Sequence, residues 1–471
     1  MERMSGLDSL FIQMDTPREY YHTIKLHILE PGADLLDMSW KEMKLVFASR
    51  LHLVPRLRQR YLGVPLGLNH PVWVDDEDFN LDYHLLRVGC PAPGSNVELC
   101  ELVSELYSRQ LDHSRPLWQA WVIEGLEGGR MALFLMISHA YADGVAIQGM
   151  MARFWDTHPD TPASTSGPAW QPRPLPSKWR LLADGLAELP AVFAGNLPAV
   201  IRGARAGRKI RQQWQDEGRE LPPSPGGAGH AETYKTRLSG PHRKFVIHSF
   251  QLARFKRIGK AFGATLNDVF LAVTSSAIRE DLIRRTGKPP VEAELTSVPF
   301  SLIPPAERTR EGNFVTTAYA LLNVQVSDPL ERLRACQHSA AIMKAYVEAT
   351  KEANVLASMN LVHPWLAVLL GRLNEASGGD LLPVTNVATS NVPGPRKELF
   401  IGHSRMVEYY SIGMITNGTT VNLTVWSYGD QMNLCILVDP EVVADPWGMV
   451  EAMESGLAEL EALVPQESKP A

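Results

Sequence analysis

The residues of this chain with the clearest capacity for chemistry form the run Ser138-His139-Ala140-Tyr141-Ala142-Asp143-Gly144. His139 directly follows Arg130 to Ser138, an apolar run that predicts a central strand buried on both faces. A histidine at such a strand end can face a cleft, and its neutral imidazole accepts a proton near pH 7. Asp143 can fold back across the turn to steer the ring, and Gly144 lets the backbone turn into the next helix. The run therefore indicates general-base catalysis.

Taken alone, the H-x-x-x-D-G pattern is a weak signal, because a histidine and an aspartate at this spacing also arise by chance. Ser138 is open to two interpretations. It can donate a hydrogen bond at the site, or it can be an alternate strand residue that faces away from His139. The sequence has no G-x-S-x-G elbow, no G-x-G-x-x-G and no phosphate-binding P-loop, so a nucleophilic serine enzyme is disfavoured.

Local patterns predict a mixed α/β chain around this run. Two short strands, Gln119 to Glu124 and Arg130 to Ser138, are separated by glycines and read as a hairpin. A capping box begins a helix at Ser95. In the second part of the chain, Thr265 can cap a long helix, and Gly429-Asp430 is a strong hairpin signal.

Size and composition predict two domains in a globular protein. A chain of 471 residues exceeds what one core usually accommodates, and 45% hydrophobic with 21% charged residues excludes disorder. We expect an N-terminal domain over 1–160, a crossover linker over 161–243 and a C-terminal domain over 244–471. The net charge of -6 gives no pull toward nucleic acid. The four cysteines lack metal-ligand spacing, so we expect reduced thiols and no metal.

The crossover linker combines apolar residues at helical spacing with two prolines, Pro190 and Pro198, so we expect broken amphipathic helices. Basic residues follow, with no acid between Glu188 and Asp216: Arg202, Arg205, Arg208, Lys209 and Arg211. Such a stretch can lie on an anionic membrane surface. Alternatively, it packs its apolar residues on one domain and leaves its charges in water. Both interpretations stay open.

Several further blocks, taken in order, resemble those of the bacterial wax ester synthase/diacylglycerol acyltransferase family over nearly the whole chain. They are Gly6 to Phe11, Pro71-Val72-Trp73, Arg115 to Trp118, Ile123 to Leu126, Asn267-Asp268-Val269, Pro299 to Leu302, Gly312-Asn313, and Ser390-Asn391-Val392-Pro393-Gly394-Pro395. One position departs from the family, whose motif is H-H-x-x-x-D-G, because Ser138 stands in place of the first histidine. His139 matches the single catalytic histidine of the wider chloramphenicol acetyltransferase-like superfamily.

The resemblance implies an α/β fold of two chloramphenicol acetyltransferase-like domains, with the active site in a tunnel between them. It implies an O-acyltransferase that moves a long-chain acyl group from acyl-CoA, a cosubstrate, to a lipophilic alcohol. The alcohol is a diacylglycerol, a fatty alcohol, or both. No bound cofactor and no metal are implied. His139 is expected to be the base, with Asp143 as a structural residue paired with an arginine.

Other blocks supply auxiliary candidates. Asn267 and Asp268, at a predicted helix start, are possible polar groups near the reaction centre, or simple helix-start residues. Ser390, Asn391, Pro393 and Gly394 read as a strand that leaves the core into a rigid turn and shapes the channel.

Two rival functions remain. One is a same-fold acyltransferase for another hydroxyl acceptor, and the other is an acyl-CoA- or lipid-binding protein without turnover. A membrane scaffold that uses the basic stretch is a weaker third. We see no secretory signal and no apolar run of membrane-spanning length, so we expect a cytoplasmic protein. Peripheral contact with the inner face of the membrane or with a lipid droplet would fit. The acceptor, the acyl-chain length and the oligomeric state stay open.

Overall fold

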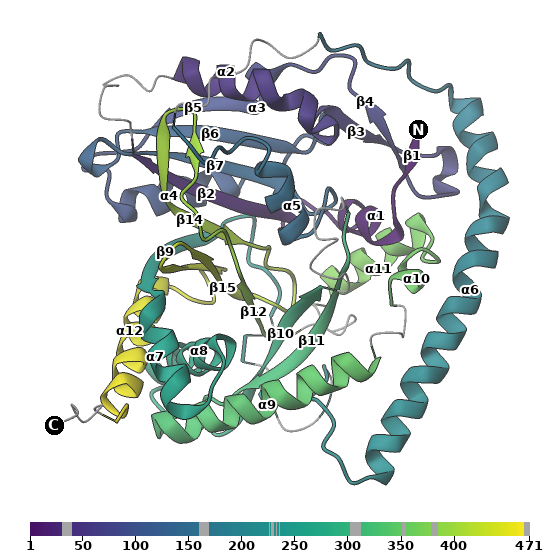
Figure 1. The fold of residues 1–471 in the computed structure, drawn as a ribbon. Helices are drawn as coiled ribbons and strands as arrows, with labels where there is room; N and C mark the ends of the chain where they lie inside the picture. Colours follow the sequence, from purple (N-terminus) through teal and green to yellow (C-terminus); the bar gives the residue numbers. More distant parts are fainter. Residues whose placement is uncertain are drawn as a thin grey trace.

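Two mixed β-sheets, each flanked by helices, form the body of the molecule in this computed structural model (Figure 1). Parts of the expected crossover linker, 161–243, and the last residue of the block from Pro299 to Leu302 lie outside the described residues. The structure describes residues 1–30, 40–159, 169–225, 227, 230–231, 233–234, 236–301, 312–350, 355–377 and 385–465.

The first sheet contains the strand that leads into His139. Its order is β13 (Phe400–Ile401), β14 (Ser404–Ile412), β2 (His22–Glu30), β7 (Met131–Ser138), β6 (Trp118–Glu124) and β5 (Leu85–Gly89). β7 lies between β2 and β6 and is buried along its whole length, which confirms the predicted central strand. β6 and β7 pair antiparallel, as the predicted hairpin requires.

Helices and a small sheet surround this first sheet. The helices are α1 (Gly6–Gln13), α2 (Trp40–Arg50), α3 (Leu81–His84), α4 (Asn96–Tyr107) and α5 (Gly144–Met151). The small sheet contains β1 (Glu2–Arg3), β4 (Val72–Asp75) and β3 (Gln59–Leu62). Short 3-10 turns are η1 (Leu51–Leu53), η2 (Pro55–Arg58), η3 (Pro65–Gly67) and η4 (Glu127–Gly129). The predicted capping box is present, since Ser95 and Glu98 cap each other at the start of α4.

The second sheet has the order β11 (Val315–Leu322), β10 (Ala293–Ser301), β12 (Val387–Val392), β15 (Val421–Tyr428), β16 (Gln431–Val438) and β9 (Lys244–Gln251), with β8 (His230–Ala231) on β10. Its helices are α7 (Leu252–Phe262), α8 (Leu266–Thr286), α9 (Pro329–Thr350), α10 (Val355–Met359), α11 (Pro364–Ala376) and α12 (Pro446–Ala462). Thr265 caps α8 and Gly429-Asp430 joins β15 to β16, as predicted.

A late segment of the chain completes the first sheet. β14 pairs antiparallel with β2, with Tyr410 opposite Leu26. β13 in turn pairs with β14. The expected C-terminal domain, 244–471, thus contributes residues 400–412 to the sheet of the N-terminal half. One buried apolar cluster accordingly extends through both halves.

In the described part of the crossover linker the chain forms one helix, α6 (Lys178–Asp216), which runs along one side of the molecule past both sheets (Figure 1). The predicted breaks at Pro190 and Pro198 are wrong, because α6 continues through both prolines. Proline has no backbone N–H, so Pro190 leaves the carbonyl of Leu186 without its helical donor and Pro198 leaves that of Ala194 without one. Both residues are solvent-exposed, so water can satisfy the two carbonyls and the cost of each proline stays small.

Within the described residues, no single helix is long and apolar enough to cross a membrane. α7 and α8 pass that test only as a pair, and they are bent by 104° at the break between them. Many residues of α8 are buried against other elements of the second half.

Gly394 offers a test of the packing around the turn after β12. Its backbone N–H donates to Ser427 Oγ at 3.1 Å, and a Cβ at this position would collide with the Ser427 carbonyl oxygen. We expect Gly394→Ala to lower the free energy of unfolding by about 1–3 kcal/mol, because backbone must move. The measurement is the thermal unfolding midpoint by calorimetry.

Gly195, inside α6, is the matched control because nothing lies within 4 Å of the point that a Cβ would occupy there. Gly195→Ala should raise stability by roughly 0.5–1 kcal/mol, since alanine is the better helix former. Equal midpoints for Gly394→Ala and the unmodified protein would contradict the close packing at the turn.

Candidate active site

A tight turn joins β7 to α5 and carries His139. The Ser138 hydroxyl accepts from the Ala140 amide at 3.3 Å, and the Tyr141 amide donates to the Ser138 carbonyl at 3.2 Å. Asp143 then caps α5, because its Oδ1 accepts from the amides of Val145 and Ala146 at 3.1 and 3.0 Å. The hydroxyl of Ser138 therefore helps to hold the turn, and its donation of a hydrogen bond at the site stays a prediction.

Residues from the second half of the chain clamp this turn. The Asp143 amide donates to the Gly312 carbonyl at 3.3 Å, and Ala142 forms a parallel bridge with Gly312. The other carboxylate oxygen of Asp143 accepts from the Phe314 amide at 3.1 Å. Asp143 is buried, and it ties the end of one half to the start of β11 in the other.

His139 lies where these two halves meet. Its amide donates to the Tyr21 carbonyl at 2.7 Å, and its ring packs on Phe11 of α1 with centroids 4.6 Å apart. The ring nitrogen Nδ1 lies 2.9 Å from Oδ1 of Asn313. The residue keeps part of its surface exposed.

The hydrogen bonds of Asn313 define the tautomer of His139. Its Nδ2 lies 2.7 Å from Oδ1 of Asp8 and 2.8 Å from the carbonyl oxygen of His139, and both of these atoms are acceptors. The amide nitrogen must therefore face them, and Oδ1 must face the imidazole. Oδ1 can only accept, so Nδ1 carries the proton. The lone pair is then on Nε2, the nitrogen free to act as a base.

Burial keeps this imidazole neutral. Desolvation lowers the pKa of His139 below its ordinary value, against the opposing effects of the Asp143 charge and the Asn313 hydrogen bond. Burial also raises the pKa of Asp8 to about 6, although Asn313 favours its ionised form. At pH 7, His139 is therefore deprotonated and Asp8 is mostly ionised.

A buried lysine lies beneath the turn. Lys25 of β2 contacts the Ser411 hydroxyl, and its Nζ lies 4.8 Å from the centre of the Trp426 ring. Burial lowers the pKa of Lys25 to about 7, while the charge of Asp143 acts in the opposite direction. Among the described residues no arginine pairs with Asp143, so the expected arginine partner is not seen there. Backbone amides of Val145, Ala146 and Phe314 donate to the carboxylate instead.

Gly144 is the first residue of α5, and its φ is not positive. A Cβ there would meet Trp426 at an ordinary 3.7 Å. The expected need for glycine in the turn is therefore not seen, because Asp143 makes the turn as the helix cap.

Asn267 and Asp268 are brought to the start of α8, where Asp268 completes a capping box by accepting from the Thr265 amide at 2.8 Å. Lys344 of α9 lies 3.6 Å from the other carboxylate oxygen. No contact among the described residues joins this pair to His139. The alternative that they are helix-start residues is favoured, since the capping box accounts for Asp268.

The block from Ser390 to Gly394 covers the last residues of β12, an inner strand of the second sheet between β10 and β15, and the turn that follows. Ser390 and Asn391 of β12 pair with Thr424 and Val425, β12 ends at Val392, and Pro393 is exposed just beyond. The turn packs at Gly394 on Trp426, the residue that also faces Gly144 and Lys25. No hydrogen bond among the described residues joins this block to His139, and its expected role in shaping the channel stays a prediction.

The sequence patterns did not single out Asp8 or Asn313 as site residues. Both belong to blocks that resemble the family, Gly6 to Phe11 and Gly312-Asn313. Membership in these blocks was the signal in the sequence that could have identified them as site residues. In the described part of the chain, no cluster of three histidine, cysteine, aspartate or glutamate residues could hold a metal ion.

Sequence comparisons give the family. The model of the wax ester synthase/diacylglycerol acyltransferase catalytic domain matches residues 4–270, and that of the C-terminal domain matches 311–461. A putative diacylglycerol O-acyltransferase of Mycobacterium tuberculosis strain H37Rv is 39% identical over 471 residues, covering 100% of this chain and 99% of the relative. A probable diacylglycerol O-acyltransferase of the same strain is 31% identical, covering 88% and 87%.

Solved structures agree in fold. The wax ester synthase/diacylglycerol acyltransferase from Marinobacter aquaeolei VT8 superposes with a TM-score of 0.67 at 23% identity, covering 98% of this chain and 99% of that one. The first condensation domain of the CDA synthetase shares the fold more distantly, with a TM-score of 0.55 at 14% identity and coverage of 99% and 97%. The chain thus belongs to the wax ester synthase/diacylglycerol acyltransferase family and is an acyltransferase.

Proposed function

We propose that this acyltransferase moves a long-chain acyl group from acyl-CoA to the hydroxyl of a lipophilic alcohol, with His139 as the general base. The observation that carries the proposal is the chain from Asp8 through Asn313 to Nδ1 of His139, which leaves Nε2 unprotonated. The names of the relatives support a diacylglycerol as acceptor, and that of the family also supports a fatty alcohol.

The reaction needs no nucleophile from the protein. Nε2 of His139 takes the proton from the alcohol hydroxyl as its oxygen attacks the thioester carbonyl. The tetrahedral intermediate collapses, the carbon–sulfur bond breaks, and His139 returns the proton to the departing CoA thiolate. The imidazolium formed between these steps is stabilised by Asn313 Oδ1 on its Nδ1–H, and Asp8 holds that amide.

We also propose that the protein works in the cytoplasm, in peripheral contact with a membrane or lipid surface, because its acceptor is lipophilic. A same-fold enzyme with another hydroxyl acceptor is separated from this proposal by a panel of alcohols offered with palmitoyl-CoA. Binding of palmitoyl-CoA without release of free CoA, whichever alcohol is offered, would indicate a lipid-binding protein.

The first prediction concerns the base. Purified protein should release free CoA from palmitoyl-CoA with hexadecanol or a diacylglycerol as acceptor, and His139→Ala should lower the rate by about 10²- to 10⁴-fold. Ser138→Ala is the control one residue away. It should stay within about tenfold of the unmodified rate, because its hydroxyl only accepts from a turn amide. Equal rates for His139→Ala and the unmodified protein would refute the base assignment.

The second prediction concerns pH. Since burial lowers the pKa of His139, the base stays deprotonated below its ordinary pKa of 6.5. The value of kcat/KM should therefore hold as pH falls through 6.5 and decline only at lower pH. Asp8 gains its proton near pH 6, and this protonation also affects the pH dependence of kcat/KM. The variant Asp8→Asn removes the effect of Asp8, so its pH profile reports the titration of His139 alone. A decline centred above pH 6.5 in both proteins would contradict the buried environment.

The third prediction tests the positioning role of Asn313. Asn313→Ala removes the acceptor on Nδ1, and we expect kcat to fall by roughly tenfold or more with KM little changed. The hydrogen bond raises the pKa of His139, so its loss should move the acid limb of kcat/KM to still lower pH.

Asn323 provides the matched control, because it is also buried and directly follows β11, and its amide donates to the Leu321 carbonyl. Asn323→Ala should reduce stability while leaving kcat and the pH profile unchanged. If the two alanine variants gave the same pH profile, Asn313 would be only structural.

A further inference from the structure

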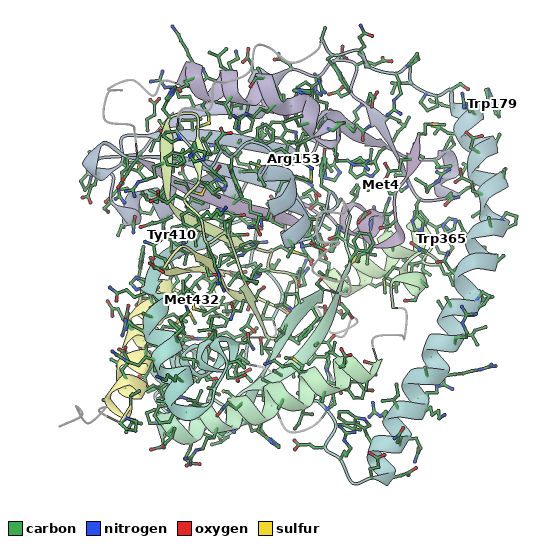
Figure 2. All side chains as sticks on the ribbon, in the orientation of Figure 1. Met4, Arg153, Trp179, Trp365, Tyr410 and Met432 are labelled. Atoms are coloured by element: carbon green, nitrogen blue, oxygen red, sulfur yellow. The ribbon has the colours of Figure 1, made fainter. Side chains whose placement is uncertain are left out.

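α6 presents apolar side chains to solvent along one face. At about 100° per residue, five residues point within roughly 40° of a single direction. Their exposed fractions are 81% for Trp179, 48% for Leu186, 50% for Phe193, 46% for Leu197 and 41% for Ile201. Figure 2 labels Trp179 at the end of α6 that lies beside the small sheet of β1, β4 and β3. We call these five residues the α6 stripe.

A different face of α6 makes the contacts with the rest of the molecule. Leu181, Gly185, Gly203 and Trp214 are buried, and the Gly185 carbonyl accepts from Asn69 Nδ2 at 3.0 Å. The α6 stripe points about 120° away from this inner face, since helix positions advance by about 100° per residue. The packing of the helix therefore leaves the stripe uncovered.

Cations follow on the same helix. By the same rotation of about 100° per residue, Arg208 and Arg211 lie within roughly 40° of the α6 stripe, and Arg202 and Lys209 point more than about 120° away from it. Arg202, Arg205, Arg208, Lys209 and Arg211 are all exposed, and none has an ion-pair partner among the described residues. The first half of α6 carries two acids, and both are already paired: Asp184 with Arg180 at 3.6 Å, and Glu188 with Arg3 at 2.7 Å.

We propose that α6 docks the enzyme on an anionic phospholipid bilayer, with the α6 stripe in the apolar boundary and the cations on lipid phosphates. An exposed apolar row followed by unpaired cations matches such a surface in both chemistry and charge. A second copy of the chain fits less well, because its α6 would bring the same five cations and, among the acids of the helix, only Asp216 without an ion-pair partner in the described residues. The inference rests on the proposed function, whose acceptor is lipophilic.

The position of α6 suits delivery of an alcohol from the bilayer. α10 and α11 lie between α6 and α1 (Figure 1), and α1 holds Phe11 and Asp8 of the His139 site. α11 has exposed apolar residues of its own: Trp365 at 58%, Leu369 at 45% and Leu373 at 48%. A bilayer against this side of the molecule would therefore be only a few helices away from His139.

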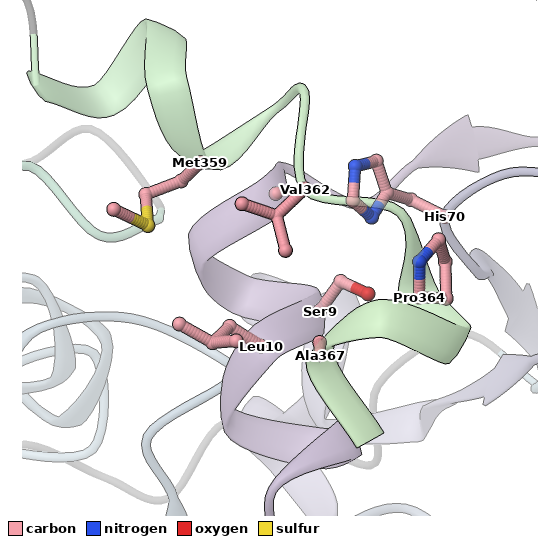
Figure 3. Close-up of a pocket in the computed structure, with 8 residues that line it drawn as sticks. Ser9, Leu10, His70, Met359, Val362, Pro364 and Ala367 are labelled. Carbon is pink, nitrogen blue, oxygen red and sulfur yellow. The ribbon is translucent and has the colours of Figure 1, made fainter. Parts of the chain in front are cut away.

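A crevice marks the junction of α1 with the segment from α10 to α11 (Figure 3). It is lined by Ser9 and Leu10 on one side, by Met359, Val362 and Ala367 on the other, and by His70. It is too narrow to hold a water molecule, so it is a seam between the elements and holds no substrate as it stands. An alcohol that followed this route would have to part α1 from α11.

The test is sedimentation of the full chain with vesicles of phosphatidylglycerol or of phosphatidylcholine, at low and high salt. We expect binding to the anionic vesicles that salt weakens. Phe193→Gln with Leu197→Gln should weaken this binding about tenfold or more. The triple variant Arg205→Gln, Arg208→Gln, Arg211→Gln should do the same, at about five-fold per cation.

Matched controls carry the same changes elsewhere. Leu45→Gln with Leu53→Gln alters two exposed leucines of the N-terminal half, whose exposed fractions are 62% and 49%. Lys256→Gln, Lys288→Gln and Lys397→Gln remove three exposed cations away from α6. Both controls should stay within about two-fold of the unmodified protein.

Three results would overturn the docking proposal. The first is an equal loss of vesicle binding in the α6 variants and in the controls. The second is equal binding of the unmodified protein to phosphatidylglycerol and phosphatidylcholine vesicles. The third is a dimer, seen by light scattering, that the apolar variant abolishes without any change in vesicle binding. CoA release with a detergent-dispersed alcohol separates this proposal from the proposed function. If the unmodified protein releases no CoA there while the vesicle results hold, the docking surface stands and the proposed function fails.

Discussion

The short segment Gly312-Asn313-Phe314 is the contact on which the candidate site depends. Its backbone pairs with the turn at Ala142 and Asp143, and its asparagine side chain reaches the imidazole of His139. The histidine comes from one half of the chain and the group that fixes its tautomer comes from the other. A functional base therefore exists only when the two halves are packed together, which makes the site a property of the junction.

Local sequence was sufficient where the structure is local. The strand before His139, the helix after it and the capping boxes at Ser95 and Thr265 all follow from spacing and residue type within a few positions. The prolines of α6 led to a wrong prediction of helix breaks. A proline inside a helix is most costly where the carbonyl that loses its donor is buried, and here both carbonyls are on exposed residues. Exposure is set by tertiary packing, which the periodicity of one segment does not reveal.

The supporting residues of the site could not be predicted in the same way. Asn313 is 174 positions from His139, and Asp8 is 305 positions from Asn313. Family resemblance marked the blocks that contain them but gave no role to either. Asp268 also belongs to a recognised block, but its side chain caps a helix and makes no contact with the site among the described residues. Membership in a block therefore indicates that a residue matters to the family without distinguishing chemistry from folding.

The pairing of β14 with β2 has a consequence for how this protein can be divided. The first sheet is completed by residues 404–412, which the chain supplies only after most of the second half. An excised N-terminal fragment would expose the backbone of β2 as an unpaired edge, a surface prone to aggregation. During synthesis, the first sheet likewise cannot close until the chain is nearly complete. Chimeras that exchange substrate preference between relatives should therefore carry β14 with the N-terminal half it belongs to in space, whatever its position in the sequence.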